Sequence, residues 1–186
     1  MSKVIIMRGP SGVGKSTYIK ENHPNAIVVS ADNFWWTENL PKGVDPSLVP
    51  SRKVDVLPLF SANNERSYTE YYVYDVTKIS QAHADCMRQF IVLLNSGPAI
   101  FPPDSVKDIV VDNTNIEIWE YTNYELLAKF SGRQVEIVEI MPATIDDLRE
   151  SIRRNEHSVP SLTVAGMTLR FQPDLRSNVT KVTMET

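Results

Sequence analysis

A glycine-rich loop near the start of the chain has residue types and spacing that suit phosphate binding. Residues 9–16 match the pattern G-x-x-x-x-G-K-[ST], and a threonine follows directly. The glycines let the backbone curl so that successive N–H groups point at phosphate oxygens, and the positive end of the next helix strengthens the attraction. In such a loop the lysine contacts the β- and γ-phosphates and the hydroxyl side chain binds Mg²⁺. The sequence therefore predicts a nucleoside-triphosphate site.

We expect the whole loop to contact the nucleotide. The predicted contacts are Gly9, Pro10, Ser11, Gly12, Val13, Gly14, Lys15, Ser16 and Thr17. Lys15 is the predicted catalytic cation, and Ser16 is the predicted Mg²⁺ ligand. The alternative is a glycine turn followed by a solvated lysine, but the loop sits between a hydrophobic strand and a helix, as a phosphate site requires.

Two acidic residues directly follow predicted strands, at the sheet edge where α/β proteins bind ligands. Asp32 follows a strand at 26–30 and could accept the proton of an attacking hydroxyl as a catalytic base, or it could only cap a turn. Asp112 follows a strand at 108–111 and could touch Mg²⁺ through water. The predicted acceptor contacts after it are Asn113, Thr114 and Asn115. Those residues could equally serve only as helix caps.

Three arginines, Arg149, Arg153 and Arg154, lie on one predicted helix. They could close over a triphosphate and stabilise charge in the transition state, or they could form a solvated helix face. His83 and Cys86 fall on the apolar stripe of another predicted helix, and we interpret both as core residues.

Eight of the 16 aromatic residues lie between positions 34 and 74, a segment that prolines and glycine mark as an insertion. They are Phe34, Trp35, Trp36, Phe60, Tyr68, Tyr71, Tyr72 and Tyr74. Aromatic side chains beside an active site can stack on nucleobases, and Arg52, Lys53 and Arg66 could contact phosphates. The alternative is a small satellite core. We predict that Trp35 or Trp36 forms an aromatic wall of the acceptor pocket.

Strand-like and helix-like segments that alternate along the chain must position these residues, a pattern typical of a parallel sheet covered by helices. Strands are predicted at residues 3–7, 26–30, 108–111 and 135–140. Helices are predicted at residues 14–22, 75–97, 114–130, after a cap at 144, and at 161–171. Capping boxes are predicted at Thr114–Glu117 and Thr144–Asp147, and the polar end beyond Pro173 is expected to fray.

Composition excludes several classes of protein. The chain has 186 residues, 42% of them hydrophobic, and a net charge of −4, which argues against a disordered chain and a strongly basic surface. A single cysteine rules out an internal disulfide. No apolar run spans a membrane, and the first residues do not resemble a signal peptide. We expect a cytoplasmic protein, in the host cytoplasm if a phage encodes it.

Taken together, these motifs resemble the P-loop kinase family of phage polynucleotide kinase and its cellular relatives. The matching segments are GPSGVGKST, VVSADNF, Ala82-His83, VDNTN with Trp119 beyond it, VEIVEI, and Arg154-Asn155-x-His157-x-Val159-Pro160. They cover about two thirds of the chain, residues 3–34 and 74–172. The resemblance implies ATP, Mg²⁺ and transfer of the γ-phosphate to a hydroxyl, often a 5′-OH of nucleic acid. It also implies Asp32 as the general base and Arg154 as a lid arginine. We expect both Arg153 and Arg154 to contact the ATP.

Two departures from that family fall on the acceptor side. Members that phosphorylate DNA ends can carry an arginine shortly after the base aspartate, whereas Trp35 and Trp36 stand here. The insertion at about 36–72 has no counterpart. One related activity suits such a pocket, namely that of phage kinases acting on hydroxymethylated pyrimidines within DNA. Such enzymes must flip or splay a base, a task for which aromatic walls are suitable.

We predict an α/β chain with the three-layer P-loop NTPase/kinase fold, a central, mainly parallel sheet and an aromatic-rich insertion. Residues 1–175 form one kinase domain, and residues 176–186 form a polar tail. The predicted activity is ATP-dependent phosphorylation of a hydroxyl on nucleic acid, with DNA as partner. The acceptor is either a 5′-OH end or the hydroxymethyl group of a pyrimidine such as 5-hydroxymethyluracil. A small-molecule or nucleoside kinase and a non-catalytic ATP-binding switch are the alternatives.

Overall fold

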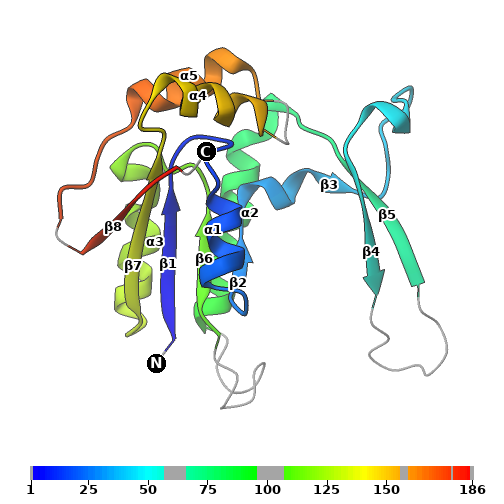
Figure 1. Ribbon diagram of the computed structural model, residues 1–186. Helices are drawn as coiled ribbons and strands as arrows, with labels where there is room; N and C mark the ends of the chain where they lie inside the picture. The colour runs from blue at the N-terminus through cyan, green and yellow to red at the C-terminus, as the bar shows by residue number, and fades with distance from the viewer. Residues whose placement is uncertain (1, 57–65, 96–106, 156–158, 177, 185–186) are drawn as a thin grey trace.

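A five-stranded parallel sheet forms the centre of the molecule (Figure 1). The computed structural model describes residues 2–56, 66–95, 107–155, 159–176 and 178–184. In the order β2–β6–β1–β7–β8, every neighbouring pair is parallel. The strands are β1 (Lys3–Arg8), β2 (Ile27–Val29), β6 (Ile109–Asp112), β7 (Gln134–Met141) and β8 (Val179–Thr183). The middle strands are nearly continuous apolar runs because both faces of the sheet are covered.

Helices pack on both faces of this sheet and give it three layers. They are α1 (Lys15–Asn22), α2 (Ile79–Asn95), α3 (Ile118–Phe130), α4 (Ile145–Arg153) and α5 (Ser161–Arg170). Phe90 of α2 and Tyr121 of α3 join Val4 and Ile6 in one buried cluster, while Ile19 of α1 joins the cluster on the other face. Helices α4 and α5 lie across the carboxyl end of the sheet (Figure 1). The predicted α/β fold is confirmed.

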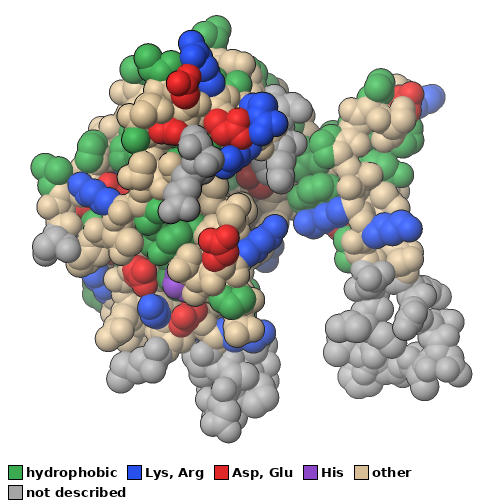
Figure 2. Space-filling model, viewed as in Figure 1, with side chains coloured by type: hydrophobic (Ala, Val, Ile, Leu, Met, Phe, Trp, Pro, Cys, Tyr) green, Lys and Arg blue, Asp and Glu red, His purple; other side chains and the backbone are tan. Residues whose placement is uncertain are grey.

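A second, antiparallel sheet stands apart from the main body (Figures 1 and 2). Its strands β3 (Trp36–Thr37), β4 (Ser51–Val56) and β5 (Arg66–Tyr72) pair in the order β3–β5–β4. The sequence marks this segment as an insertion and predicts no strands in it. Prolines divide the segment, and its strands are polar on their exposed faces, so the apolar pattern of a buried strand is absent. The part of the insertion at 57–65 lies outside the described residues.

Short 3₁₀ turns connect several of these elements. They are η1 (Ala31–Trp35), η2 (Pro46–Leu48) and η3 (Val76–Lys78). The turn η1 directly follows β2 and leads into the second sheet, so it lies where the two sheets join. Gly97, the predicted end of α2, and His157 lie outside the described residues.

Helix α3 begins later than predicted. The expected cap was Thr114, but the helix starts at Ile118, and the Glu117 backbone N–H donates to the Glu120 side chain at 3.1 Å. Asn115 breaks the helical pattern because its φ is +44°, a left-handed conformation that asparagine tolerates. By contrast, the predicted capping box at Thr144 is confirmed, with Asp147 and Thr144 bonding reciprocally.

The C-terminal segment does not fray as expected. Strand β8 lies within the predicted tail and pairs with β7, and Met184 packs into the core. A buried polar network holds the preceding residues: Arg8 is ion-paired with Glu139, and Glu139 also accepts the backbone N–H of Asp174 at 2.8 Å. Asp174 in turn accepts from the Arg176 guanidinium. Buried charges need such partners, and residues of the C-terminal segment complete the hydrogen bonds of the Arg8–Glu139 pair.

Within the described residues, no helix is long and apolar enough to cross a membrane.

Candidate functional site

The glycine-rich loop joins β1 to α1 in a conformation that its glycines make possible. Gly9, Gly12 and Gly14 all have positive φ, at +139°, +79° and +96°. A Cβ on Gly12 would lie 1.9 Å from the carbonyl oxygen of Ser151 in α4, and a Cβ on Gly9 would meet a β7 carbonyl. The loop therefore curls tightly against neighbouring backbone, and its N–H groups are directed by conformations that glycine adopts readily.

Lys15 begins helix α1 and turns back over the loop. Its ammonium donates to the carbonyl oxygens of Gly9 at 3.0 Å and Pro10 at 2.8 Å. Burial lowers the pKa of Lys15, while the nearby carboxylates of Asp112 and Asp32 oppose that shift. The charge thus lies within the curl of the loop, where a phosphate group would compete with the two carbonyls.

Next to this lysine, a hydroxyl and a carboxylate meet at the predicted metal position. The Ser16 hydroxyl lies 3.3 Å from Asp112 Oδ2, at the end of β6. Both are hard oxygen donors, which Mg²⁺ prefers, and Mg²⁺ normally completes its shell with water and phosphate oxygens. No group of three or more potential His, Cys, Asp or Glu ligands occurs among the described residues. The donors present therefore fit a Mg²⁺ ion that is carried largely by a nucleotide.

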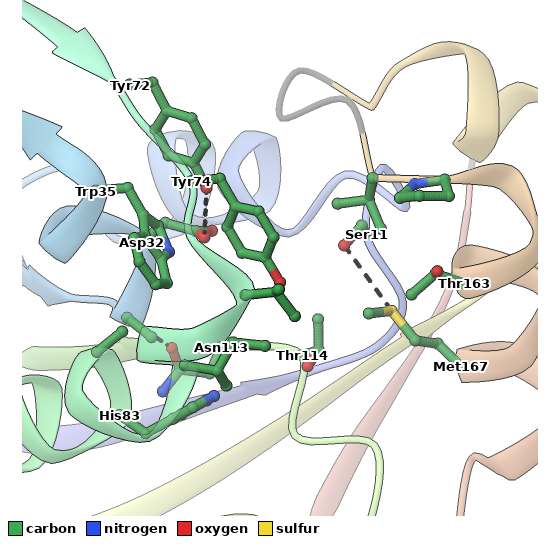
Figure 3. Close-up of a pocket in the computed structure, with 16 residues that line it drawn as sticks. Ser11, Asp32, Trp35, Tyr72, Tyr74, His83, Asn113, Thr114, Thr163 and Met167 are labelled. Carbon is green, nitrogen blue, oxygen red and sulfur yellow. Dashed lines mark hydrogen bonds between the residues drawn. The ribbon is translucent and has the colours of Figure 1, made fainter. Parts of the chain in front are cut away.

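A cavity of about 530 Å³ opens between this loop and the start of the second sheet (Figure 3). Ser11 of the loop and Asp32 of η1 both line it, with Trp35, Tyr72 and Tyr74 beside Asp32. Thr163 and Met167 of α5 line the side nearest Ser11. Its volume falls in the range of roughly 300–1,000 Å³ that is usual for small-molecule sites.

Asp32 is held at this cavity by two contacts. Its backbone N–H donates to the Ser30 hydroxyl at 3.2 Å, which caps η1, and its Oδ1 accepts a hydrogen bond of 3.1 Å from the Tyr72 hydroxyl (Figure 3). Burial, together with the neighbouring carboxylate, raises the pKa of Tyr72 far above its usual range, so this tyrosine stays protonated and donates. The sequence analysis did not predict Tyr72 as a site residue. The aromatic richness of the insertion was the only signal that pointed to it.

The predicted acceptor residues divide between the cavity and the core. Asn113 and Thr114 line the cavity, and Asn113 Oδ1 also accepts from the Ala31 backbone at 2.9 Å. Asn115 is buried instead, and its amide donates to the Met7 carbonyl at 2.8 Å. Asn115 therefore supports β1 and does not line this cavity.

The two tryptophans also occupy different places. Trp35 is buried, lines the cavity and makes edge contacts with Phe34 and Tyr74. Trp36 lies outside the cavity lining, under the Arg52 guanidinium at 4.3 Å.

His83 was expected in the core, but it is exposed and lines the cavity (Figure 3). The prediction of a core residue is confirmed for Cys86, which is buried one helical turn further along α2. His83 differs because this end of α2 extends past the sheet to the cavity, where its apolar neighbours Val76 and Ile79 are exposed too.

The predicted lid arginines point to a carboxylate on their own helix. Arg153 and Arg154 both pair with Glu150, at 2.6 Å each, and these hydrogen bonds lower the pKa of Glu150 to about 2. Neither arginine lines the cavity. Their role at a nucleotide stays a prediction.

Comparisons with known proteins give a matching family and solved structures of similar fold. A family model described as an AAA domain matches residues 4–173. A gluconokinase from Sinorhizobium meliloti 1021 superposes with a TM-score of 0.54 at 13% identity, over 99% of this chain and 83% of that one. A sugar kinase from Janibacter sp. HTCC2649 gives 0.48 at 12% identity, over 98% of this chain and 84% of that one. AvrRxo1-ORF1:-ORF2 with ATP gives 0.49 at 18% identity, over 83% of this chain and 40% of that one.

At such low identity, the likeness to the gluconokinase bears on the fold alone. It agrees with the parallel sheet, the phosphate loop and the helices described above, so the chain has a kinase-like P-loop fold. The finer resemblance to phage polynucleotide kinase stays a prediction.

Proposed function

The chain belongs to the AAA domain family, and from that premise we propose that it is an ATP-dependent phosphotransferase that phosphorylates a hydroxyl group. One observation carries the proposal: Ser11 of the phosphate loop and Asp32 line the same cavity, and the Asp32 carboxylate also acts on the charge of Lys15. A donor phosphate at the loop and an acceptor hydroxyl at Asp32 would therefore lie close to one another. Positioning of this kind supplies much of the catalysis in phosphoryl transfer.

In the proposed reaction, Asp32 accepts the proton of the acceptor hydroxyl. The hydroxyl oxygen forms a bond to the γ-phosphorus, and the bond from that phosphorus to the β,γ-bridging oxygen breaks, leaving ADP. Tyr72 keeps Asp32 Oδ1 in place through its hydrogen bond. Lys15 exchanges the loop carbonyls for phosphate oxygens and stabilises their negative charge.

Ser16 and Asp112 are the residues that would hold Mg²⁺, the latter through water. When bound, the ion would neutralise charge on the β- and γ-phosphates. Arg154 lies at the end of α4, next to the segment that leads into α5 and the cavity. We propose that Arg153 and Arg154 leave Glu150 for the triphosphate when the nucleotide binds.

For the acceptor we propose a hydroxyl on nucleic acid, either a 5′-OH end or a hydroxymethyl group on a pyrimidine of DNA. The aromatic side chains at the cavity support a base or nucleoside as the entering group. The predicted phosphate contacts on the second sheet give less support, because Arg52 is paired with Glu70 at 2.7 Å. Basic and acidic side chains are also interspersed over the face in Figure 2.

A free nucleoside or another small molecule is the second candidate acceptor. The cavity volume of about 530 Å³ favours it, because such a space accommodates a single small molecule.

Transfer of labelled γ-phosphate from ATP to a panel of acceptors tests the proposal. The panel contains a 5′-OH oligonucleotide, the same oligonucleotide with a 5′-phosphate and one 5-hydroxymethyluracil, a free nucleoside, and water alone. We expect label on an organic hydroxyl and acceptor-stimulated ATP turnover. Label on the nucleoside alone would select the second candidate. Slow hydrolysis that no acceptor stimulates would contradict kinase activity and favour an ATP-binding switch.

A further inference from the structure

The cavity beside Asp32 contains almost no charge. Among the described residues that line it, none is lysine or arginine, and Asp32 is the only carboxylate. An anionic acceptor such as a sugar acid or a nucleoside monophosphate would find no lysine or arginine among these residues to pair with, and it would also face the Asp32 carboxylate. Burying an unpaired charge beside a like charge is strongly unfavourable.

The cations of the phosphate loop and of α4 have other partners, and on the acceptor side Arg52 is paired with Glu70 and Lys78 with Asp75. The Lys15 ammonium donates hydrogen bonds to the carbonyl oxygens of Gly9 and Pro10 in the phosphate loop, and a donor phosphate bound there would pair with its charge. Arg153 and Arg154 are paired with Glu150. These positive charges lie on the donor side, so none of them serves an anion at the far side of the cavity near Trp35.

On that far side, aromatic and aliphatic side chains form much of the wall. Trp35 and Tyr74 meet edge to face, with ring centroids 5.0 Å apart, and Ile79 and Ala82 of α2 line the same cavity. The polar groups there are Asp32, the hydroxyls of Tyr72 and Thr114, Asn113 and His83. This arrangement suits a planar ring that packs on aromatic and aliphatic side chains while its hydroxyl points at Asp32.

We propose that the part of the acceptor entering this cavity is an uncharged, planar ring system that carries the reacting hydroxyl, as a nucleoside or a substituted nucleobase does. Any phosphate of the acceptor stays outside the cavity. This inference rests on the proposed kinase function and narrows its acceptor. A free nucleoside and a nucleotide unit within a strand share this chemistry.

Matched acceptors test the inference through kcat/KM for labelled phosphate transfer. The pairs are a nucleoside and its 3′-monophosphate, each with a free 5′-OH, and a neutral glucoside and gluconate. A 5-hydroxymethyluracil nucleoside and an oligonucleotide containing that unit distinguish the free source from the strand. We expect kcat/KM for the neutral nucleoside to exceed kcat/KM for its own monophosphate and for both sugars by at least tenfold. Whether the free 5-hydroxymethyluracil nucleoside or the oligonucleotide has the higher kcat/KM shows which of the two sources the cavity takes.

A variant that adds charge gives a gain-of-function test. Val76 lines the cavity and is 66% exposed, so Val76→Lys should fold normally and place a cation at the cavity. It should raise kcat/KM for the nucleoside monophosphate relative to the nucleoside about fivefold or more. The neutral control, Val76→Gln, should leave that ratio unchanged.

A second variant tests the aromatic wall. Tyr74 lines the cavity and is 55% exposed, so Tyr74→Ala should remain folded. It should lower kcat/KM for the ring acceptor by about five- to a hundredfold, since stacking on one aromatic side chain contributes that much, and leave KM for ATP unchanged. Tyr71→Ala on the same segment is the control, because Tyr71 does not line the cavity.

The inference is overturned if gluconate or the nucleoside monophosphate is the best acceptor, or if Val76→Lys does not change the preference while the protein transfers phosphate. Loss of transfer to every acceptor would instead refute the proposed kinase function. The two failures are therefore distinguishable.

Discussion

Removing one hydroxyl, in Tyr72→Phe, should slow phosphate transfer without unfolding the protein. The Tyr72 ring is buried and packs edge to face on Trp36, with centroids 5.4 Å apart, and phenylalanine preserves both features. What disappears is the hydrogen bond of 3.1 Å to Asp32 Oδ1. Asp32 is exposed to the cavity, so water can replace the lost donor, and the melting temperature should change little.

The size of the effect follows from the chemistry of that bond. Hydrogen bonds to a charged group contribute about 1.5–3 kcal/mol. At 3.1 Å this bond is longer than the usual O–H···O distance, so we take the lower end, about 1.5 kcal/mol, which corresponds to roughly a tenfold loss in kcat. KM for ATP should stay unchanged because Tyr72 lies on the acceptor side of the cavity.

A double-mutant cycle with Asp32→Asn isolates the role of this contact. If Tyr72 acts by holding the Asp32 carboxylate, Tyr72→Phe should cost about tenfold in the wild-type background and almost nothing in the Asp32→Asn background. Single-turnover rates at saturating ATP and acceptor provide the measurement. Equal losses in both backgrounds, or a faster Tyr72→Phe enzyme, would refute the positioning argument.

Three further predictions concern the phosphate loop and the fold. Gly12→Ala should lower the free energy of unfolding by about 2–5 kcal/mol, because its Cβ would clash with the Ser151 carbonyl and its φ is positive. Gly14→Ala should lower it by only about 1–2 kcal/mol, because a Cβ there has no neighbour within 4 Å. Equal losses for the two variants in chemical denaturation would contradict the packing account. Lys15→Met should reduce kcat at least a hundredfold with the fold intact by circular dichroism, and near-normal turnover would exclude a catalytic phosphate loop. The Arg176 guanidinium lowers the pKa of Asp174 below its usual value. The ion pair between Asp174 and Arg176 should therefore stabilise the fold fully above about pH 4, and this stabilisation should be lost as the pH falls further and Asp174 becomes protonated. The difference in melting temperature between wild type and Asp174→Asn should therefore shrink between pH 6 and pH 3, and a constant difference would rule out this linkage.

Local patterns were sufficient to predict the glycine-rich loop and the strand and helix that flank it. The phosphate loop is a contiguous motif, and the strand and helix around it are short, regular segments whose hydrophobic pattern is plain in the sequence. Asp32 could be placed because the carboxyl ends of parallel strands converge at one edge of the sheet. In the structure, Ser11 of the loop and Asp32 line one cavity.

The acceptor side depends on contacts between residues that are far apart in the chain. Tyr72 reaches Asp32 across 40 positions, through a second sheet whose strands have no strong apolar pattern. Strand β8 is polar by itself and is stabilised by pairing with β7. Asn115 has the residue type of a ligand contact, but its left-handed backbone turns it toward β1, a conformation that spacing alone does not reveal.

The most direct test of the proposed function compares wild type and Asp32→Asn in single-turnover transfer of labelled γ-phosphate, with the dissociation constant of ATP measured on the same proteins. Asparagine keeps the size of the side chain but cannot accept the proton. The proposal predicts unchanged ATP affinity and a transfer rate that is lower by about 10²- to 10⁴-fold. A collapse of ATP affinity with a near-normal rate at saturation would contradict it, and would make Asp32 a nucleotide-site or structural residue.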